Sequence, residues 1–129
     1  MSNYSIATYS LRSFEETVEI VKSALKEEGF GVLTEIDVQS KMKEKLNKEM
    51  RPYLILGACH PSSAHKAIEI EEEIGLFLPC NCLIFEDTKG VVRVAAIRPS
   101  LTVGITANPN LKKLAADIEV KLAKVISKV

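Results

Sequence analysis

Hydrophobic residues recur along this chain at two different spacings, and their alternation predicts a domain of mixed strands and helices. Spacings of three and four residues are typical of an amphipathic helix, whereas a spacing of two, or a short continuous apolar run, is typical of a strand. The strand pattern occurs at residues 4–11, 30–37, 53–59, 80–85 and 91–97. The helix pattern occurs at residues 14–28, 38–46, 61–73 and 109–129. The predicted order is therefore β-α-β-α-β-α-β-β-α.

The first helix has signals at both of its ends. Ser13 and Glu16 form a capping box, in which each side chain can satisfy a free backbone amide near the helix start. Gly29 can adopt the left-handed conformation that ends a helix. Between these signals an apolar stripe recurs at spacings of four, three and four residues: Phe14, Val18, Val21 and Leu25.

The second and third strands show different burial patterns. In the second, period two places Val32, Thr34 and Ile36 on one face and the acidic Glu35 on the other. The third, residues 53–59, is almost continuously apolar, which is typical of a strand buried on both faces.

The third helix follows at once, because Pro61 suits a first helical position. We expect it to continue to residue 73. Residues 74–78 then form an apolar link, since a helix cannot continue through Pro79.

The last two strands are predicted to pair as an antiparallel hairpin through the loop at residues 86–90, where Gly90 can take a positive φ. Residues 98–107 read as irregular, and Asn108 then caps the final helix. In that helix Ile118 and Leu122 lie at the centre of the apolar stripe. The hairpin indicates an α+β fold: a curved, mainly antiparallel five-stranded sheet covered by helices.

Length and charge limit the classes of function. A chain of 129 residues fits a single domain, residues 1–129. The 17 basic and 17 acidic residues balance, which argues against a nucleic-acid partner, because such proteins need excess positive charge against phosphates. No apolar run reaches the length of a membrane span, so we expect no membrane partner. The sequence begins without the features of an export signal and has three cysteines, which predicts a cytoplasmic protein with reduced thiols.

Three cysteines are the main candidates for chemistry. Cys59 ends a buried strand just before a predicted helix start, where the helix dipole could stabilise a thiolate. Cys80 and Cys82 lie two residues apart, on the same face of a predicted strand. A free cysteine is also among the most buried residue types, and we expect packing rather than reactivity for these thiols.

Other polar residues near the thiols complete the candidate set. Glu35 could act as a base or a hydrogen-bond anchor if it points inward, but we expect it to face the solvent. Asn81 can satisfy backbone groups at a strand end. His60 and His65 are five residues apart, and with the cysteines they match no zinc-binding spacing, so we expect neither a metal nor a cofactor.

The chain resembles the family catalogued as domain of unknown function 302. The resemblance covers nearly the whole chain and rests on residues 31–38 (GVLTEIDV), 53–61 (YLILGACHP) and 74–81 (IGLFLPCN). It implies a fold of the TATA-binding-protein class and pairing as homodimers. It also implies Cys at 59 and 80, a carboxylate at Glu35 and an amide at Asn81, whereas Cys82 departs from the family's usual apolar residue.

Two classes of function remain open. The first is a dimeric module that binds a small ligand or a partner chain, with Glu35, Cys59, His60, Cys80 and Asn81 as candidate binding residues. The second is a thiol-based enzyme or sulfur carrier, in which Cys59 is the nucleophile, Cys80 is its partner thiol, and Glu35 and Asn81 position the substrate. The sequence favours the binding module, because it contains no complete catalytic constellation. A homodimer is expected from the resemblance, the zero net charge and the apolar run at residues 101–105.

Overall fold

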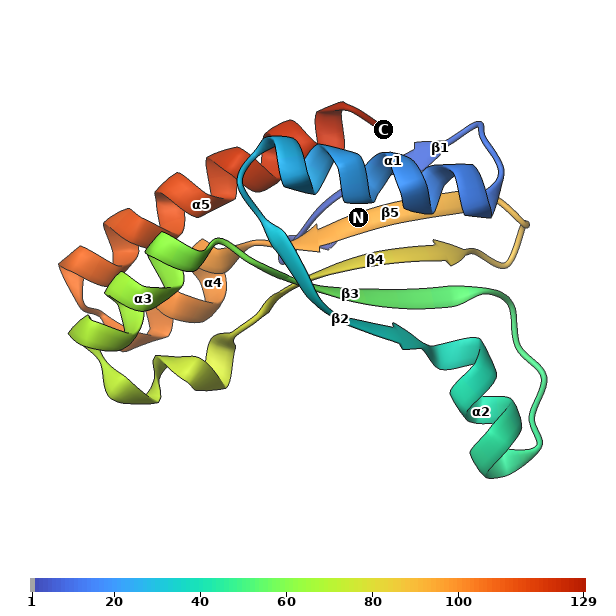
Figure 1. Ribbon diagram of the computed structural model, residues 1–129, viewed down its shortest axis with the longest axis horizontal. Coiled ribbons are helices and arrows are strands. Elements are labelled where there is room, and N and C mark those ends of the chain that lie inside the picture. The colour runs from blue at the N-terminus through green and yellow to red at the C-terminus, as the bar shows by residue number, and fades with distance from the viewer. Residues whose placement is uncertain (1) are drawn as a thin grey trace.

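A computed structural model describes residues 2–129 as one antiparallel five-stranded sheet with its two longest helices on one face (Figure 1). The elements are β1 (Ser5–Ser10), α1 (Phe14–Glu27), β2 (Gly31–Asp37), α2 (Val38–Leu46), β3 (Tyr53–Cys59), α3 (Pro61–Ile70), the 3₁₀ helix η1 (Glu72–Phe77), β4 (Cys80–Glu86), β5 (Val92–Ile97), α4 (Pro99–Thr102), the 3₁₀ helix η2 (Val103–Thr106) and α5 (Pro109–Ser127). The α+β class and the predicted order of the strands are confirmed.

The sheet has the strand order β1-β5-β4-β3-β2, and every neighbouring pair is antiparallel. Residues directly opposite one another in an antiparallel pair point to the same face. One such row crosses the whole sheet on the face covered by α1 and α5: Glu35, Leu56, Cys82, Ala96 and Ile6. The neighbouring row on the opposite face, which α1 and α5 do not cover, is Ile36, Ile55, Leu83, Ala95 and Ala7.

The main core lies between this covered face and the two helices. Leu25 of α1, Leu56 of β3 and Leu122 of α5 are all fully buried in it. Ile118 is also buried, so the predicted stripe of the last helix is confirmed. A second, smaller cluster of buried residues forms at one end of the sheet: Ala67, Ile74 and Leu111.

Ser13 and Gly29 mark the ends of the first helix as predicted, but the Glu16 carboxylate binds the Ser13 hydroxyl rather than the Ser13 backbone amide of a capping box. The Ser13 side chain accepts a hydrogen bond from the Glu16 amide and donates one to the Glu16 carboxylate, each at 3.1 Å. Gly29 takes a φ of +85° just after the helix end. In the β4–β5 loop Gly90 likewise takes a φ of +78°, as the hairpin requires.

The predicted faces of the second strand are confirmed for Thr34, Glu35 and Ile36 but are wrong for Val32, because β2 contains a bulge between Val32 and Thr34. The extra residue, Leu33, shifts the alternation by one position. Thr34 and Ile36 therefore point to the uncovered face, whereas Glu35 shares the covered face with Val32.

Two segment boundaries also differ from expectation. The third helix ends at Ile70, three residues before the predicted end, and the segment expected to be an apolar link lies mostly in η1. Residues 98–107, read as irregular, contain the short helices α4 and η2. These pieces combine with α3 and α5 to cover one end of the sheet (Figure 1).

Helix α2 has the predicted bounds and no buried residue. Figure 1 shows it on the side of the sheet away from α1 and α5. The Gln39 side chain donates a hydrogen bond of 2.9 Å to the carbonyl of Met50, which ties α2 to the loop before β3.

None of the helices described in residues 2–129 has the length and apolarity needed to cross a membrane.

Candidate functional site

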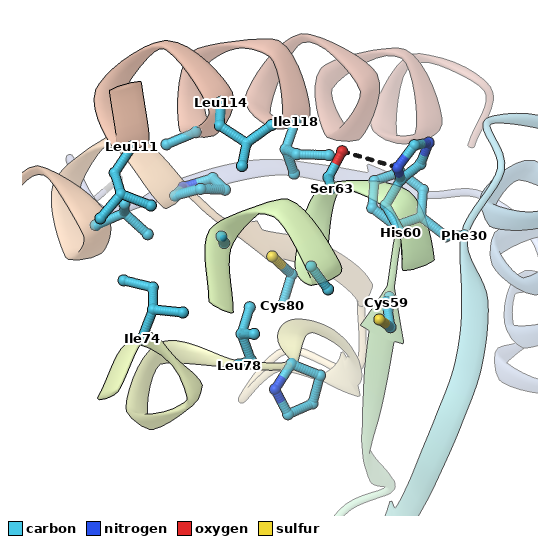
Figure 2. A pocket seen from close by; sticks show the side chains of 17 residues that line it. Phe30, Cys59, His60, Ser63, Ile74, Leu78, Cys80, Leu111, Leu114 and Ile118 are labelled. Carbon is cyan, nitrogen blue, oxygen red and sulfur yellow. Dashed lines mark hydrogen bonds between the residues drawn. The ribbon is translucent and has the colours of Figure 1, made fainter. Parts of the chain in front are cut away.

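A cavity of about 60 Å³ lies at the end of the sheet where β3 ends and β4 begins. Helix α3 and helix α5 cover it from above, and η1, α4 and η2 close its far end (Figures 1 and 2). Its wall is almost wholly apolar and is made by Phe30, Ala58, Cys59, His60, Ser63, Ala64, Ala67, Ile74, Leu78, Pro79, Cys80, Pro99, Val103, Leu111, Leu114, Ala115 and Ile118. The cavity thus separates the main core from the smaller cluster.

The end of β3 and the start of β4 lie side by side at the cavity. Ala58 and Cys80 are register partners at the end of the β3–β4 ladder. A Cβ atom added to Gly57 would lie 2.8 Å from Cγ of Pro79 and would overlap the Thr34 side chain. A glycine at this position therefore lets Pro79 pack directly on β3, next to the cavity wall.

His60 occupies the link between β3 and α3. Its ring packs edge-on against Phe30, with 5.5 Å between ring centroids and an interplanar angle of 71°. A Cβ atom built on Gly29 would lie 3.1 Å from Nε2, so that edge of the ring lies against the Gly29 backbone. Burial, and secondly the positive charge of Lys121, lower the pKa of His60 below its usual value. Both effects favour the neutral imidazole over the charged form.

The other ring nitrogen of His60 has a hydrogen-bonding partner in α3. Nδ1 lies 2.9 Å from the Ser63 Oγ, and either atom can be the donor, depending on the histidine tautomer (Figure 2). Both residues line the cavity. Ser63 is not among the candidate residues that the sequence indicates. A serine three residues after a histidine at a helix start is a weak signal in a sequence. The cavity beside Ser63 and His60 is what makes the pair a candidate site.

Two of the three thiols lie in the cavity wall, and the third is in the core. Burial, followed by the influence of Cys59, raises the pKa of Cys80 from 9.0 to about 11. Burial, followed by the influence of Cys80, raises the pKa of Cys82 from 9.0 to about 12. Both are therefore protonated at neutral pH, and a protonated thiol is a poor nucleophile. Cys59 is partly exposed, and all three cysteines are free.

Two of the candidate binding residues lie elsewhere. Glu35 does not line the cavity, and its Oε1 lies 2.9 Å from Nζ of Lys22 in α1. Asn81 is exposed on β4, opposite Gly57, and is also absent from the cavity wall. The structure therefore brings together Cys59, His60 and Cys80, and the binding roles of all five residues remain predictions.

Metal-ligating residues do not gather anywhere in residues 2–129: no group of three or more His, Cys, Asp or Glu side chains is placed to hold an ion. His65 is exposed on α3, with Nδ1 2.9 Å from the Glu69 carboxylate, and it does not line the cavity.

Comparison with known families accounts for the fold around this cavity. The family model described as domain of unknown function DUF302 matches residues 6–129. The chain belongs to the DUF302 family. Among solved structures, this DUF302 chain is similar to the crystal structure of an uncharacterized conserved DUF302 protein from Bacillus stearothermophilus. The two share 31% identity with a TM-score of 0.91, over 98% of this chain and 98% of that chain. A comparison with curated proteins finds no match.

Membership in the DUF302 family confirms the resemblance found in the sequence. Two of the three segments that carry the resemblance contribute residues to the cavity wall, whereas residues 31–38 form β2 and the first residue of α2. Residues 53–61 include β3, Cys59 and His60, and residues 74–81 include Ile74, Pro79 and Cys80. The motifs that identify the family thus build much of the cavity wall.

Proposed function

We propose that this protein is a homodimeric module that binds a small apolar ligand in the cavity at the end of the sheet. The observation that carries the proposal is the apolar cavity itself, which lies between two packed clusters and has His60 and Ser63 in its wall. Ligand sites are typically concave and mostly apolar, with a few polar groups that orient the ligand.

The free-energy cost of an empty cavity of this size favours the binding of a ligand. Protein interiors are close-packed, and an unfilled cavity costs about 24 cal/mol per Å³. For the 60 Å³ here the cost is roughly 1.4 kcal/mol. A ligand that fills the space regains these contacts, and any ligand that binds only the folded state also stabilises it.

The thiols favour binding over the thiol-enzyme alternative. Cys80, the expected partner thiol, is protonated at neutral pH because its pKa is about 11. Glu35, the expected assisting carboxylate, is paired with Lys22 and lies outside the cavity. The alternative therefore depends on Cys59 alone.

Free thiols are also typical of a reducing compartment, so we place the proposed module in the cytoplasm.

The uncovered face of the sheet supports the homodimer. A continuous apolar row crosses it from β2 to β1, with Ile55 and Leu83 at its centre. Beside this row Tyr53 stacks on Phe85, with 5.4 Å between ring centroids. An apolar sheet face needs a covering layer, and a second copy supplies one by two-fold symmetry. The zero net charge of the chain leaves little repulsion between two copies.

Xenon tests the ligand-binding part, because it is apolar and enters dry protein cavities. We expect xenon to shift the amide NMR signals of residues around the cavity, such as Ala67 and Ile74. Ala115→Val adds two carbons to the cavity wall and should abolish these shifts. Ala116→Val is the matched control, because Ala116 is the next residue of α5 and is exposed. Absence of xenon binding in the unmodified protein would overturn the ligand-binding function.

Sedimentation tests the dimer separately. At low micromolar concentration we expect twice the chain mass of 14.2 kDa. Leu83→Glu places a charge at the centre of the apolar row and should give a monomer, whereas Val120→Glu, on the exposed side of α5, should not. A single 14.2 kDa species from the unmodified chain would refute the dimer and leave the cavity proposal standing.

A further inference from the structure

The polar part of the cavity wall is confined to a few neutral groups. Within residues 2–129 no Asp, Glu, Lys or Arg lines the cavity. The side chains that can hydrogen-bond there are the His60 ring, the Ser63 hydroxyl and the thiols of Cys59 and Cys80. Since a charge placed in an apolar site without a partner of opposite sign is strongly disfavoured, this wall suits an uncharged ligand.

The Ser63–His60 pair offers both kinds of hydrogen bond. If the Ser63 hydroxyl donates to Nδ1 across their 2.9 Å separation, its oxygen can still accept a hydrogen bond. If Nδ1–H donates instead, the Ser63 hydroxyl hydrogen is free to donate. The pair can therefore bind the O–H of an alcohol in one tautomer and the oxygen of a carbonyl group in the other.

We propose that the cavity binds a small uncharged alcohol, aldehyde, ketone or amide, with the oxygen of the ligand on Ser63 and the hydrocarbon part among Ile74, Leu111 and Ile118. This inference rests on the proposed ligand-binding function and names its ligand class. Figure 2 shows Ser63 and His60 on one side of the cavity and Ile74 and Leu111 facing each other across its far end.

The ligand is small. At roughly 10 to 15 Å³ of accessible volume for each water-sized group, a 60 Å³ cavity holds about five non-hydrogen atoms. Isobutanol has this size and also has the polarity that the wall requires. It is a suitable probe, with xenon as its purely apolar counterpart.

His60 acts through Ser63 and is held in place for that role. The Phe30 ring packs against the His60 ring in an edge-to-face arrangement, and the Gly29 backbone lies against the Nε2 edge of His60. The Nδ1 edge is therefore the one that faces Ser63. We assign His60 as a positioning residue and Ser63 as the residue that touches the ligand.

Lys121 is a positive group that acts on this site, since its charge contributes to lowering the pKa of His60. Its influence could favour a carboxylate at the cavity mouth. Isobutyrate and isobutyramide test this directly, because they have the same number of non-hydrogen atoms and differ in charge. We expect isobutyramide to bind at least tenfold more tightly.

The decisive experiment is an NMR titration of the full chain with xenon and with isobutanol at pH 7. Ser63→Ala should weaken isobutanol binding roughly threefold to tenfold, the effect of one lost hydrogen bond, and leave xenon binding unchanged. Ser63→Thr keeps a hydroxyl and should restore isobutanol binding. Ser62→Ala is the matched control, because Ser62 is the adjacent, exposed residue. The His60 ring signals should shift with isobutanol in the unmodified protein and not in Ser63→Ala.

Each outcome has a distinct meaning. If xenon binds but Ser63→Ala leaves isobutanol affinity unchanged, the Ser63 anchor is refuted and the apolar ligand-binding function stands. If isobutyrate binds more tightly than isobutyramide, the ligand class is charged and this inference is wrong. If xenon does not bind at all, the ligand-binding function and this inference fall together.

Discussion

Gly57 of β3 lies directly against the ring of Pro79, and a Cβ atom at Gly57 would come within 2.8 Å of the Pro79 Cγ. Pro79 lies between η1 and β4 and lines the cavity, so this contact holds the start of β4 against β3 beside the cavity. The backbone of β3 leaves no room for a side chain on this face, since Thr34 crowds it from the other strand.

Gly57→Ala should therefore destabilise the protein. Forcing a methyl group into a packed site costs about 1 to 3 kcal/mol, which a urea or guanidinium melt would measure. Gly75→Ala is the control, because a Cβ there meets no atom within 4 Å, and its effect should stay within about 0.5 kcal/mol. Equal stability of the two variants would show that Pro79 does not pack on β3 in solution.

The apolar stripe of α5 predicts a large effect of truncation. Leu122 is fully buried and Ile118 is nearly so, and we expect either one changed to Ala to lower the free energy of unfolding by about 2 to 5 kcal/mol. Val120→Ala is the control, because Val120 is 57% exposed on the same helix. A loss below about half a kcal/mol for Leu122→Ala would mean that α5 does not pack on the sheet.

Ile118 has a second role that separates it from Leu122. It lines the cavity, whereas Leu122 lies in the main core. Ile118→Ala should therefore enlarge the cavity and strengthen xenon binding, and Leu122→Ala should leave the xenon site itself intact. Equal xenon affinity in the Ile118→Ala variant and the unmodified chain would contradict the position given to this side chain.

The ion pair between Glu35 and Lys22 should contribute little to stability. The two side chains are 47% and 31% exposed, and pairs of this kind contribute about 0.2 to 1 kcal/mol. A double-mutant cycle with Glu35→Gln and Lys22→Met should measure a coupling energy in that range, and it should decrease in high salt. Isobutanol affinity should not change in either variant, because Glu35 lies outside the cavity wall. A loss of isobutanol binding in Glu35→Gln would instead show that Glu35 takes part in the binding site.

Local sequence patterns predict the helices well where the spacing of apolar residues and the capping residues alone determine the structure. The stripe and caps of α1, and the bounds of α2, follow from helical spacing and capping chemistry alone. The face of Val32 could not be found in this way, because a bulge at Leu33 shifts the alternation and nothing in the local spacing marks it. The early end of α3 at Ile70 was missed for a related reason. The η1 segment packs Ile74 into a cluster with Leu111, a residue distant in the sequence.

The candidate site was predicted only in part. Cys59, His60 and Cys80 stand at strand ends, and the sequence indicates that those ends come together in a sheet. The far wall of the cavity comes from α5, including Leu111, which only the tertiary fold brings there. Ser63 was missed because its significance depends on the His60 ring and the cavity together.

The buried thiols should make the protein less stable in alkaline solution. In the unfolded chain Cys80 ionises near pH 9, but in the folded protein its pKa is about 11. The folded state therefore retains a proton that the unfolded state releases, and the free energy of unfolding falls as pH rises from about 9 to about 11. Cys80→Ala should show a smaller decrease over this range in denaturant melts at graded pH. An unchanged slope would mean that Cys80 is not buried in solution.

The same burial predicts how the thiols react, and this separates the two classes of function. Alkylation requires a thiolate, so brief iodoacetamide treatment of the native protein near pH 7 should leave Cys80 and Cys82 unmodified, since their pKa values are about 11 and about 12. We expect Cys59 to be protected as well, because it ends an apolar strand and lies in the cavity wall. In denaturant all three should react, and mass spectrometry of peptides identifies each site. Selective modification of Cys59 in the native protein below about pH 7 would instead support the thiol-based enzyme, because only a thiolate stabilised by its surroundings reacts under those conditions.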